Sequence, residues 1–144
     1  MNLSEHFTLE ELTASEIAAR KGLDNTPSKF EIDNLTRLAN KLEEIRKVLA
    51  KPIMINSAFR SIETNQAVGG VKSSQHCLGC AADIKVPGMS PDEVVRAIIN
   101  SKIQYDQLIR EFDSWTHISI PNMPSDTPRN QTLIVDKTGT RPFK

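Results

Sequence analysis

The chain is organised around Ser74-Gln75-His76-Cys77-Leu78-Gly79-Cys80-Ala81-Ala82-Asp83, together with Trp115-Thr116-His117-Ile118-Ser119 downstream. The two stretches offer two imidazoles and one carboxylate, those of His76, Asp83 and His117. Three protein ligands with a fourth position left for water are typical of a catalytic zinc site, whereas structural zinc is usually held by four protein ligands. The pattern therefore indicates a metal site that is open to a water molecule.

Both stretches lead into predicted strands whose alternation agrees on where this site lies. In residues 81–86, Ile84 and Val86 share one face while Asp83 points to the other. In residues 115–120 the apolar Ile118 and Ile120 likewise share one face, opposite His117. We therefore expect a sheet with helices behind it and with Asp83 and His117 together on its open face.

The remaining sequence predicts a single α+β domain over residues 1–144, with a small antiparallel sheet and helices packed on one face. Its core is expected over about residues 1–121, and residues 122–144 are expected to form an extended tail with one short strand at 132–135. Capping-box and proline signals predict helices over about 8–20, from Thr26-Pro27 to about 50, and over 90–100. A strand is expected over 53–59, a polar loop over 60–79 and a hairpin over 105–112 and 115–120.

Composition narrows the class of protein. The 144 residues hold 18 Lys and Arg against 18 Asp and Glu, so there is no basic footprint for nucleic acid. No apolar run approaches the length of a membrane span, and residues 1–7 lack the basic and apolar segments of a secretory signal. We expect a monomer without nucleic-acid partners, made in the cytoplasm without a signal peptide.

The cysteines Cys77 and Cys80 form a C-x-x-C inside the candidate metal loop. This pattern is compatible with a redox pair or with a mixed site in which both thiolates join His76. Thiolate ligands would leave Asp83 and His117 without a role. We therefore favour the interpretation that both cysteines are small apolar fillers.

Several short motifs in order carry a family resemblance. They are Phe7-Thr8-x-x-Glu11-Leu12, Asp24-Asn25-x-Pro27, Ser57-Ala58-Phe59-Arg60-Ser61, Asn65, Val68-Gly69-Gly70, Ser74-x-His76, Gly79-x-Ala81-x-Asp83 and Trp115-x-His117-Ile118-Ser119. With them the chain resembles the zinc D-alanyl-D-alanine carboxypeptidase family, in particular its small phage and prophage domains, over roughly residues 1–121. The resemblance implies a zinc D-alanyl-D-alanine peptidase or Hedgehog-like fold.

The resemblance also implies roles for individual residues. One zinc ion per chain would be held by His76, Asp83 and His117. Arg60 would face the substrate, because its fork suits anions, unless it only forms a surface ion pair. Ser74 would bind the substrate or cap its loop, and Trp115 would form a pocket wall or a packing contact.

The catalytic carboxylate is the point at which the sequence departs from part of the family. Several members carry an acid three residues before the last histidine, where this chain has Ser114. Related zinc domains place a glutamate six residues before it, which matches Glu111, and Asp113 is the alternative. A two-residue turn at Asp113-Ser114 would put Glu111 on the wrong face, whereas a three-residue loop over 113–115 would pair it with His117. We predict Glu111.

The resemblance therefore predicts a zinc metallopeptidase that hydrolyses a peptide bond in peptidoglycan stem peptides. A D-alanyl-D-alanine carboxypeptidase or a related endopeptidase of the phage lysis type, acting on the cell wall after release or as a virion component, is the leading expectation. The alternative is a non-catalytic wall-binding or virion structural domain that keeps the fold.

Overall fold

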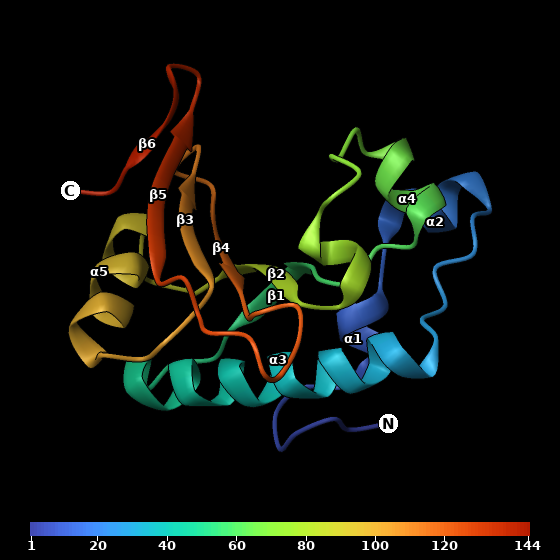
Figure 1. Cartoon of the computed structure of the whole chain (residues 1–144), viewed down its shortest axis with the longest axis horizontal. Coiled ribbons are helices and arrows are strands. Elements are labelled where there is room, and N and C mark those ends of the chain that lie inside the picture. The colour runs from blue at the N-terminus through green and yellow to red at the C-terminus, as the bar shows by residue number, and fades with distance from the viewer.

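The structure, a computed structural model, describes all 144 residues. A six-stranded sheet carries helices against one face (Figure 1), and the predicted α+β class is confirmed. The helices are α1 (Leu9–Thr13), α2 (Glu16–Lys21), α3 (Lys29–Leu49), α4 (Ile62–Ala67), the 3-10 helix η1 (Gln75–Leu78) and α5 (Pro91–Ser101). The strands are β1 (Met54–Ser57), β2 (Ala81–Lys85), β3 (Gln107–Glu111), β4 (Trp115–Ser119), β5 (Gln131–Asp136) and β6 (Gly139–Pro142).

The sheet has the strand order β1-β2-β4-β3-β5-β6. Four of its neighbouring pairs are antiparallel, as expected, but β3 and β5 run parallel, which the prediction of an antiparallel sheet did not include. A parallel pair needs a long connection, and the chain between β3 and β5 supplies one that contains β4 and residues 120–130. The sheet is therefore mixed.

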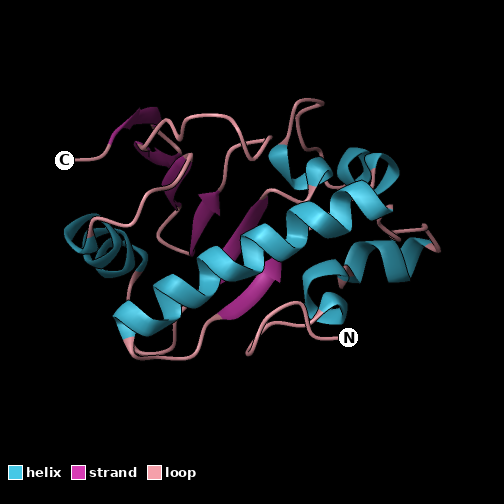
Figure 2. Ribbon diagram, turned by 60° about the horizontal axis from the view of Figure 1, so that its bottom comes forward, coloured by secondary structure: helices cyan, strands magenta, loops and turns pink.

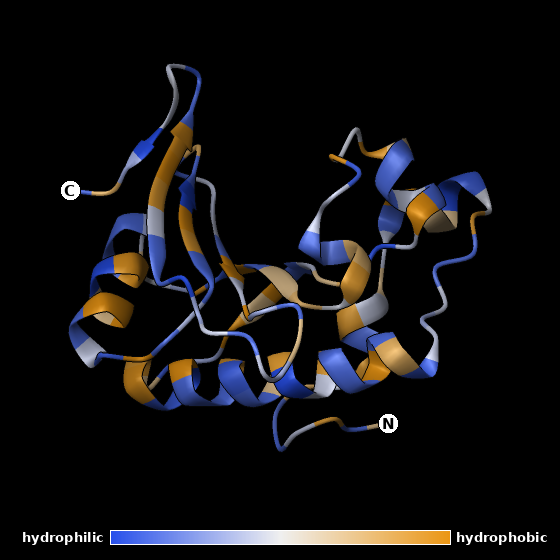
Figure 3. Cartoon of the chain, in the orientation of Figure 1, coloured by the Kyte–Doolittle hydropathy of each residue, from blue (hydrophilic) through white to orange (hydrophobic).

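The core lies between the sheet and α3. The long helix runs across the sheet (Figure 2), and apolar residues recur among its charged ones (Figure 3). The stripe of Leu35, Leu38, Leu42 and Ile45 is completely buried, as helical periodicity predicts. It belongs to the same apolar cluster as Ile84 and Ile118, so these residues set which sheet face is covered and leave Asp83 and His117 on the other.

Three predicted boundaries are wrong. The first helix is interrupted because Ala14 is extended (ψ 133) and Ser15 begins α2 by accepting a hydrogen bond from the Ala18 amide. The long helix begins after Ser28, which forms a capping box with Glu31, and not at Thr26-Pro27. The predicted loop over 60–79 contains two short helices, α4 and η1, each capped at its start by a serine side chain.

The β3–β4 hairpin has a register that neither predicted turn gives. Glu111 pairs with Trp115 across a loop of Phe112, Asp113 and Ser114. Phe112 and Asp113 both adopt positive φ (53° and 51°), and the Ser114 amide donates to the Glu111 carbonyl at 2.9 Å. Trp115 and His117 lie two residues apart on one strand, so Glu111 still shares a face with His117.

The C-terminal segment, residues 122–144, is more than the surface tail that we predicted. Its strand β5 is six residues long and joins the sheet beside β3, and β6 adds the last strand. None of the helices in the structure combines the length and the apolar character needed to cross a bilayer.

Candidate metal centre

The sheet register brings two of the predicted ligands face to face. Asp83 on β2 pairs directly with His117 on β4. Both side chains project from the face opposite the α3 core, as strand alternation predicts. His76 comes from η1, which ends at Gly79 in the left-handed conformation just before β2 begins. The sheet and this single helical turn thus converge on one point.

The three side chains are close enough to share one ion. His117 Nδ1 lies 3.0 Å from Asp83 Oδ1, and His76 Nε2 lies 3.4 Å from Asp83 Oδ2. One ligand atom from each of the three residues lies within 4.8 Å of the others. The imidazole ring centres are 5.3 Å apart. No other group of three or more potential ligands occurs in the chain.

A backbone contact fixes the orientation of His76. Its Nδ1 lies 2.6 Å from the carbonyl oxygen of Ala58, and a carbonyl can only accept, so Nδ1 carries the hydrogen. The lone pair is then on Nε2, the nitrogen that faces Asp83. Histidine ligands of metal ions commonly bind the ion through one ring nitrogen and donate a hydrogen bond from the other ring N–H to a carbonyl.

Burial and hydrogen bonding keep Asp83 and His76 in the protonation states that a metal requires. Burial works against ionisation of Asp83, but hydrogen bonds with His117 and His76 outweigh it and hold the pKa of the carboxyl well below its ordinary value. Burial lowers the pKa of His76. A neutral imidazole and an ionised carboxylate are the forms that bind metal ions.

The residues fit zinc. Zinc takes histidine nitrogen and carboxylate oxygen at about 2.0–2.2 Å, so tetrahedral ligands lie about 3.4 Å apart. The nitrogen–oxygen separations of 3.0 and 3.4 Å in the cluster are close to this value. Three protein ligands leave a fourth position for water, as in catalytic zinc sites.

A second carboxylate, that of Glu111, stands beside the cluster without joining it. Glu111 Oε1 lies 3.9 Å from His117 Nδ1, and Glu111 Oε2 accepts a hydrogen bond from the indole nitrogen of Trp115 at 3.0 Å. Burial, together with the negative charge of Asp83, raises the pKa of Glu111 above its ordinary value. Raised carboxyl pKa values suit acid–base chemistry near neutral pH.

Comparison with known proteins agrees with this geometry. The family model described as peptidase M15 matches residues 5–119, which is most of the chain and includes all three ligands and Glu111. The chain belongs to the peptidase M15 family. The predicted zinc metallopeptidase class is thereby confirmed.

A curated relative of this M15 chain is the zinc D-Ala-D-Ala carboxypeptidase of Streptomyces albus G. The two are 44% identical over 45 residues, a match that covers 31% of this chain and 18% of the relative. The matched region is therefore well under two thirds of the relative's length.

Asp113, the alternative acid in this M15 chain, points elsewhere. Its side chain is 72% exposed, and it forms an ion pair of 3.0 Å with Arg110. Arg110 also reaches Asp92 at the start of α5, on the helical side of the sheet. Of the two predicted acids, only Glu111 lies at the ligand cluster.

The structure places Arg60 and Ser74 close to His76. The Arg60 amide donates to the His76 carbonyl at 3.1 Å, and the positive charge of the side chain acts on both His76 and Glu111. Arg60 Nε is buried without a hydrogen-bond partner, and no ion pair involves Arg60. Ser74 caps η1 by accepting from the His76 amide at 3.2 Å, which is the loop-capping role.

The cysteines lie outside the ligand cluster. Cys80 is buried, which raises the pKa of its thiol to about 11, and burial also raises the pKa of Cys77. Protonated thiols are poor metal ligands. The interpretation of both residues as packing groups therefore agrees with the structure better than a thiolate site does.

Two hollows border the strands that carry the ligands. One, the polar hollow, has a volume of about 380 Å³ and is lined by His117 together with Val71, Ser73, Ser74, Gln75, Gln107, Ile109, Asn122 and Arg129. It lies between the loop after α4 and the strands β3 and β4, which stand on opposite sides in Figure 1. It contains His117, one ligand of the cluster, and so opens onto the centre.

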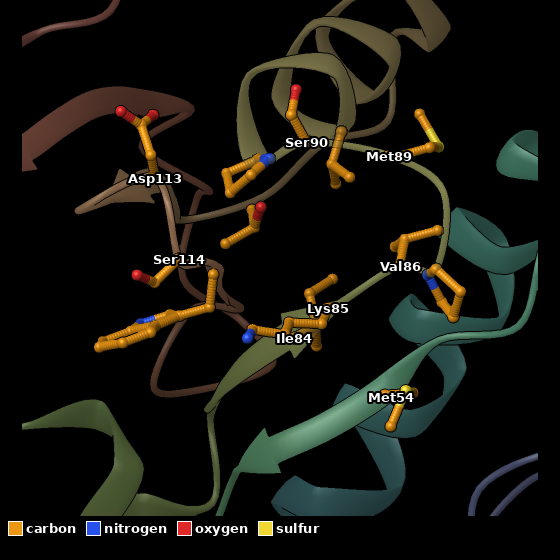
Figure 4. A pocket seen from close by; sticks show the side chains of 13 residues that line it. Met54, Ile84, Lys85, Val86, Met89, Ser90, Asp113 and Ser114 are labelled. Atoms are coloured by element: carbon orange, nitrogen blue, oxygen red, sulfur yellow. The ribbon is translucent and has the colours of Figure 1, made fainter.

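The other, the apolar hollow, has a volume of about 440 Å³ and contains none of the three ligands. Figure 4 shows Met54 on one side of it and Asp113 and Ser114 of the β3–β4 turn on the opposite side. Trp115 also lines it. Trp115 thus lines a hollow that contains none of the ligands, so its predicted contact with the substrate stays a prediction. Its indole also holds Glu111, a contact for which the sequence carries no signal.

Proposed function

We propose that this M15 chain hydrolyses a peptide bond in peptidoglycan stem peptides, with Glu111 as its general base and acid. The observation that carries the proposal is the placement of Glu111. Its carboxylate is held by Trp115 at 3.0 Å and stands 3.9 Å from a nitrogen of the ligand cluster. A purely metal-binding or structural domain has no need of a half-buried carboxylate there.

Different residues bind the metal and transfer the proton in the proposed reaction. His76, Asp83 and His117 would hold the zinc ion, which when bound supplies a Lewis acid and a water of lowered pKa. Glu111 takes the proton of the attacking water on its carboxylate and then gives it to the leaving amine. Its raised pKa favours the first transfer, because a carboxylate of higher pKa is a stronger base towards the proton of the water.

Arg60 and Ser74 lie beside the ligand cluster, close to His76. The Arg60 guanidinium has no carboxylate partner in the chain, and its charge acts on both His76 and Glu111. A planar fork of donors suits the carbonyl oxygen under attack or a terminal carboxylate. Ser74 lines the polar hollow beside His117 and offers a hydroxyl to the peptide.

A bond that involves D-alanine is the leading choice, with an endopeptidase of the stem or cross-bridge as the nearest variant. Support comes from the Streptomyces albus G relative, whose name specifies the D-Ala-D-Ala bond, although the match covers a minor part of each chain. We further propose a wall-degrading enzyme of the phage lysis type, monomeric, that reaches the wall after release or in the virion.

Mass spectrometry of muropeptides tests activity and bond choice together. Zinc-loaded protein is incubated with purified muropeptides, and the mass lost identifies the bond. Glu111→Gln is expected to keep zinc and lose hydrolysis, while Asp113→Asn is expected to keep both. If the wild-type protein binds zinc and muropeptides but cuts no bond, the non-catalytic binding domain is the correct function.

A further inference from the structure

The C-terminal segment reaches the polar hollow beside the metal centre. Asn122 and Arg129 line the hollow together with His117. Both residues follow the region that the family model matches, residues 5–119. Part of the wall next to the centre is therefore built by a segment to which the family match assigns nothing.

A buried carboxylate holds this segment in place. The Asp106 side chain is 6% exposed, and its two oxygens accept from the amide, Nε and Nη2 of Arg129 at 2.7–3.2 Å. Asp106 also accepts from Gln75 Nε2 at 3.1 Å. Since Gln75 precedes His76 directly, one carboxylate ties the metal-ligand loop to the C-terminal segment.

The neighbouring contacts make the arrangement rigid. Gln75 Nε2 also donates to Asn122 Oδ1 at 2.8 Å, which fixes both amide orientations. Just after Arg129, the Asn130 amide donates to the Tyr105 carbonyl and the Gln131 amide to that of Asp106. Arg129 thus lies just before β5 with its backbone and its Nε and Nη2 held, and little side-chain freedom remains to be lost when a ligand binds.

The lining favours an anion. Arg129 is 56% exposed, and its Nη1 makes no hydrogen bond within the chain, because the contacts to Asp106 use only Nε and Nη2. Asn122 Nδ2 and the hydroxyl of Ser73 are further donors in the wall, and no carboxylate lines the hollow.

We infer that the polar hollow is a specificity subsite in which Arg129 Nη1 and Asn122 Nδ2 bind a carboxylate of the peptide substrate, away from the scissile bond. The inference rests on the proposed peptidase function. Arg60 is not part of this hollow, so the subsite is separate from the arginine beside the cluster. The carboxylate comes from either the C-terminus or a side chain of the peptide.

The test uses zinc-loaded full-length protein and three synthetic stem peptides: one with all carboxylates free, one amidated at the C-terminus and one amidated at its acidic side chain. Arg129→Gln is expected to raise KM for the free peptide about tenfold with little change in kcat, the effect of losing one charge-assisted hydrogen bond. For one of the two amidated peptides, KM should be the same for the variant and the wild type. The carboxylate that is amidated in that peptide is the one that the subsite binds.

Arg141→Gln is the matched control, because Arg141 also pairs with an aspartate, Asp136, and also lies in the C-terminal segment. It is expected to leave KM unchanged. Because Arg129→Gln removes a partner from buried Asp106, Asn122→Asp supplies a second variant that leaves the ion pair intact. Its new charge should repel the same carboxylate and raise KM for the free peptide alone.

An equal change in KM for the free peptide and for both amidated peptides would overturn the inference. Failure of the proposed function is a different result, in which no peptide is cut. In that case, binding at the subsite is still tested by the dissociation constants of the three peptides, measured by fluorescence titration of Glu111→Gln. The subsite is supported if Glu111→Gln binds the free peptide more tightly than one amidated peptide and loses this preference when Arg129→Gln is added. Equal affinities of Glu111→Gln for all three peptides would overturn it.

Discussion

Replacing Trp115 by phenylalanine isolates one hydrogen bond at the proposed base. The substitution keeps an aromatic ring in the wall but removes the indole N–H that donates to Glu111 Oε2 at 3.0 Å. A hydrogen bond to a charged group contributes about 1.5–3 kcal/mol. Glu111 is only 21% exposed, so water replaces the lost donor poorly. At 1.36 kcal/mol for each factor of ten, kcat/KM should fall roughly ten- to hundredfold.

The pH dependence gives a second readout with a definite sign. The Trp115 hydrogen bond stabilises the ionised form of Glu111 and lowers its pKa, against burial and the charge of Asp83, which raise it. Removing the bond therefore raises the pKa further. The base is then protonated over a wider range, and the acidic limb of the kcat/KM profile should move to higher pH.

The assay measures kcat/KM from acidic to alkaline pH on protein with verified zinc content. Tyr105→Phe is the control, because it also removes one aromatic polar group, the hydroxyl that shares a hydrogen bond with Thr132 Oγ1 outside the metal centre. Trp115→Phe should bind zinc as wild type does. A variant with kcat/KM within twofold of wild type and an unmoved acidic limb would refute the role given to this hydrogen bond.

Three further predictions concern the frame of the site. His76→Ala should lose zinc by plasma emission analysis, because it removes one of three ligands; retained stoichiometry would contradict the ligand set. Gly79→Ala should lower Tm by roughly 5 °C or more, since Gly79 has φ +79° and an added Cβ would lie 2.7 Å from the Glu31 carbonyl oxygen. Hydrogen bonds from Arg129 lower the pKa of Asp106 below 3.8. The stability that Asp106 contributes is thus complete above its unfolded pKa and is lost as pH falls through the lower folded value. Urea unfolding at pH 7 and below pH 4 should show a smaller acid loss for Asp106→Asn than for wild type.

Strand alternation was sufficient to predict the shared face of Asp83 and His117, because the apolar residues Ile84 and Ile118 leave only one face for the core. Two members of the cluster could therefore be placed together from strand alternation, whereas His76 lies in a predicted loop and was joined to them by the family resemblance. The hairpin register could not be predicted from sequence, since it depends on positive φ at Phe112 as well as Asp113. Aspartate tolerates that conformation, but phenylalanine gives no signal of it. Glu111 reached the predicted face by a pairing different from the one considered.

The role of the C-terminal segment lay outside what local patterns can show. Its parallel pairing with β3 and its ion pair with Asp106 join residues more than 20 positions apart. No periodicity or spacing in residues 122–130 marks Asn122 or Arg129 as neighbours of His117. Likewise, the Ala58 carbonyl that orients His76 is a backbone group, which any residue type supplies.

The most direct test of the central claim is hydrolysis by zinc-loaded wild type and Glu111→Gln, measured on the same muropeptides with zinc content determined in each sample. We expect about one zinc ion per chain in both proteins and cleavage of a stem-peptide bond by the wild type only. Cleavage by Glu111→Gln at the wild-type rate, with zinc present, would contradict this expectation.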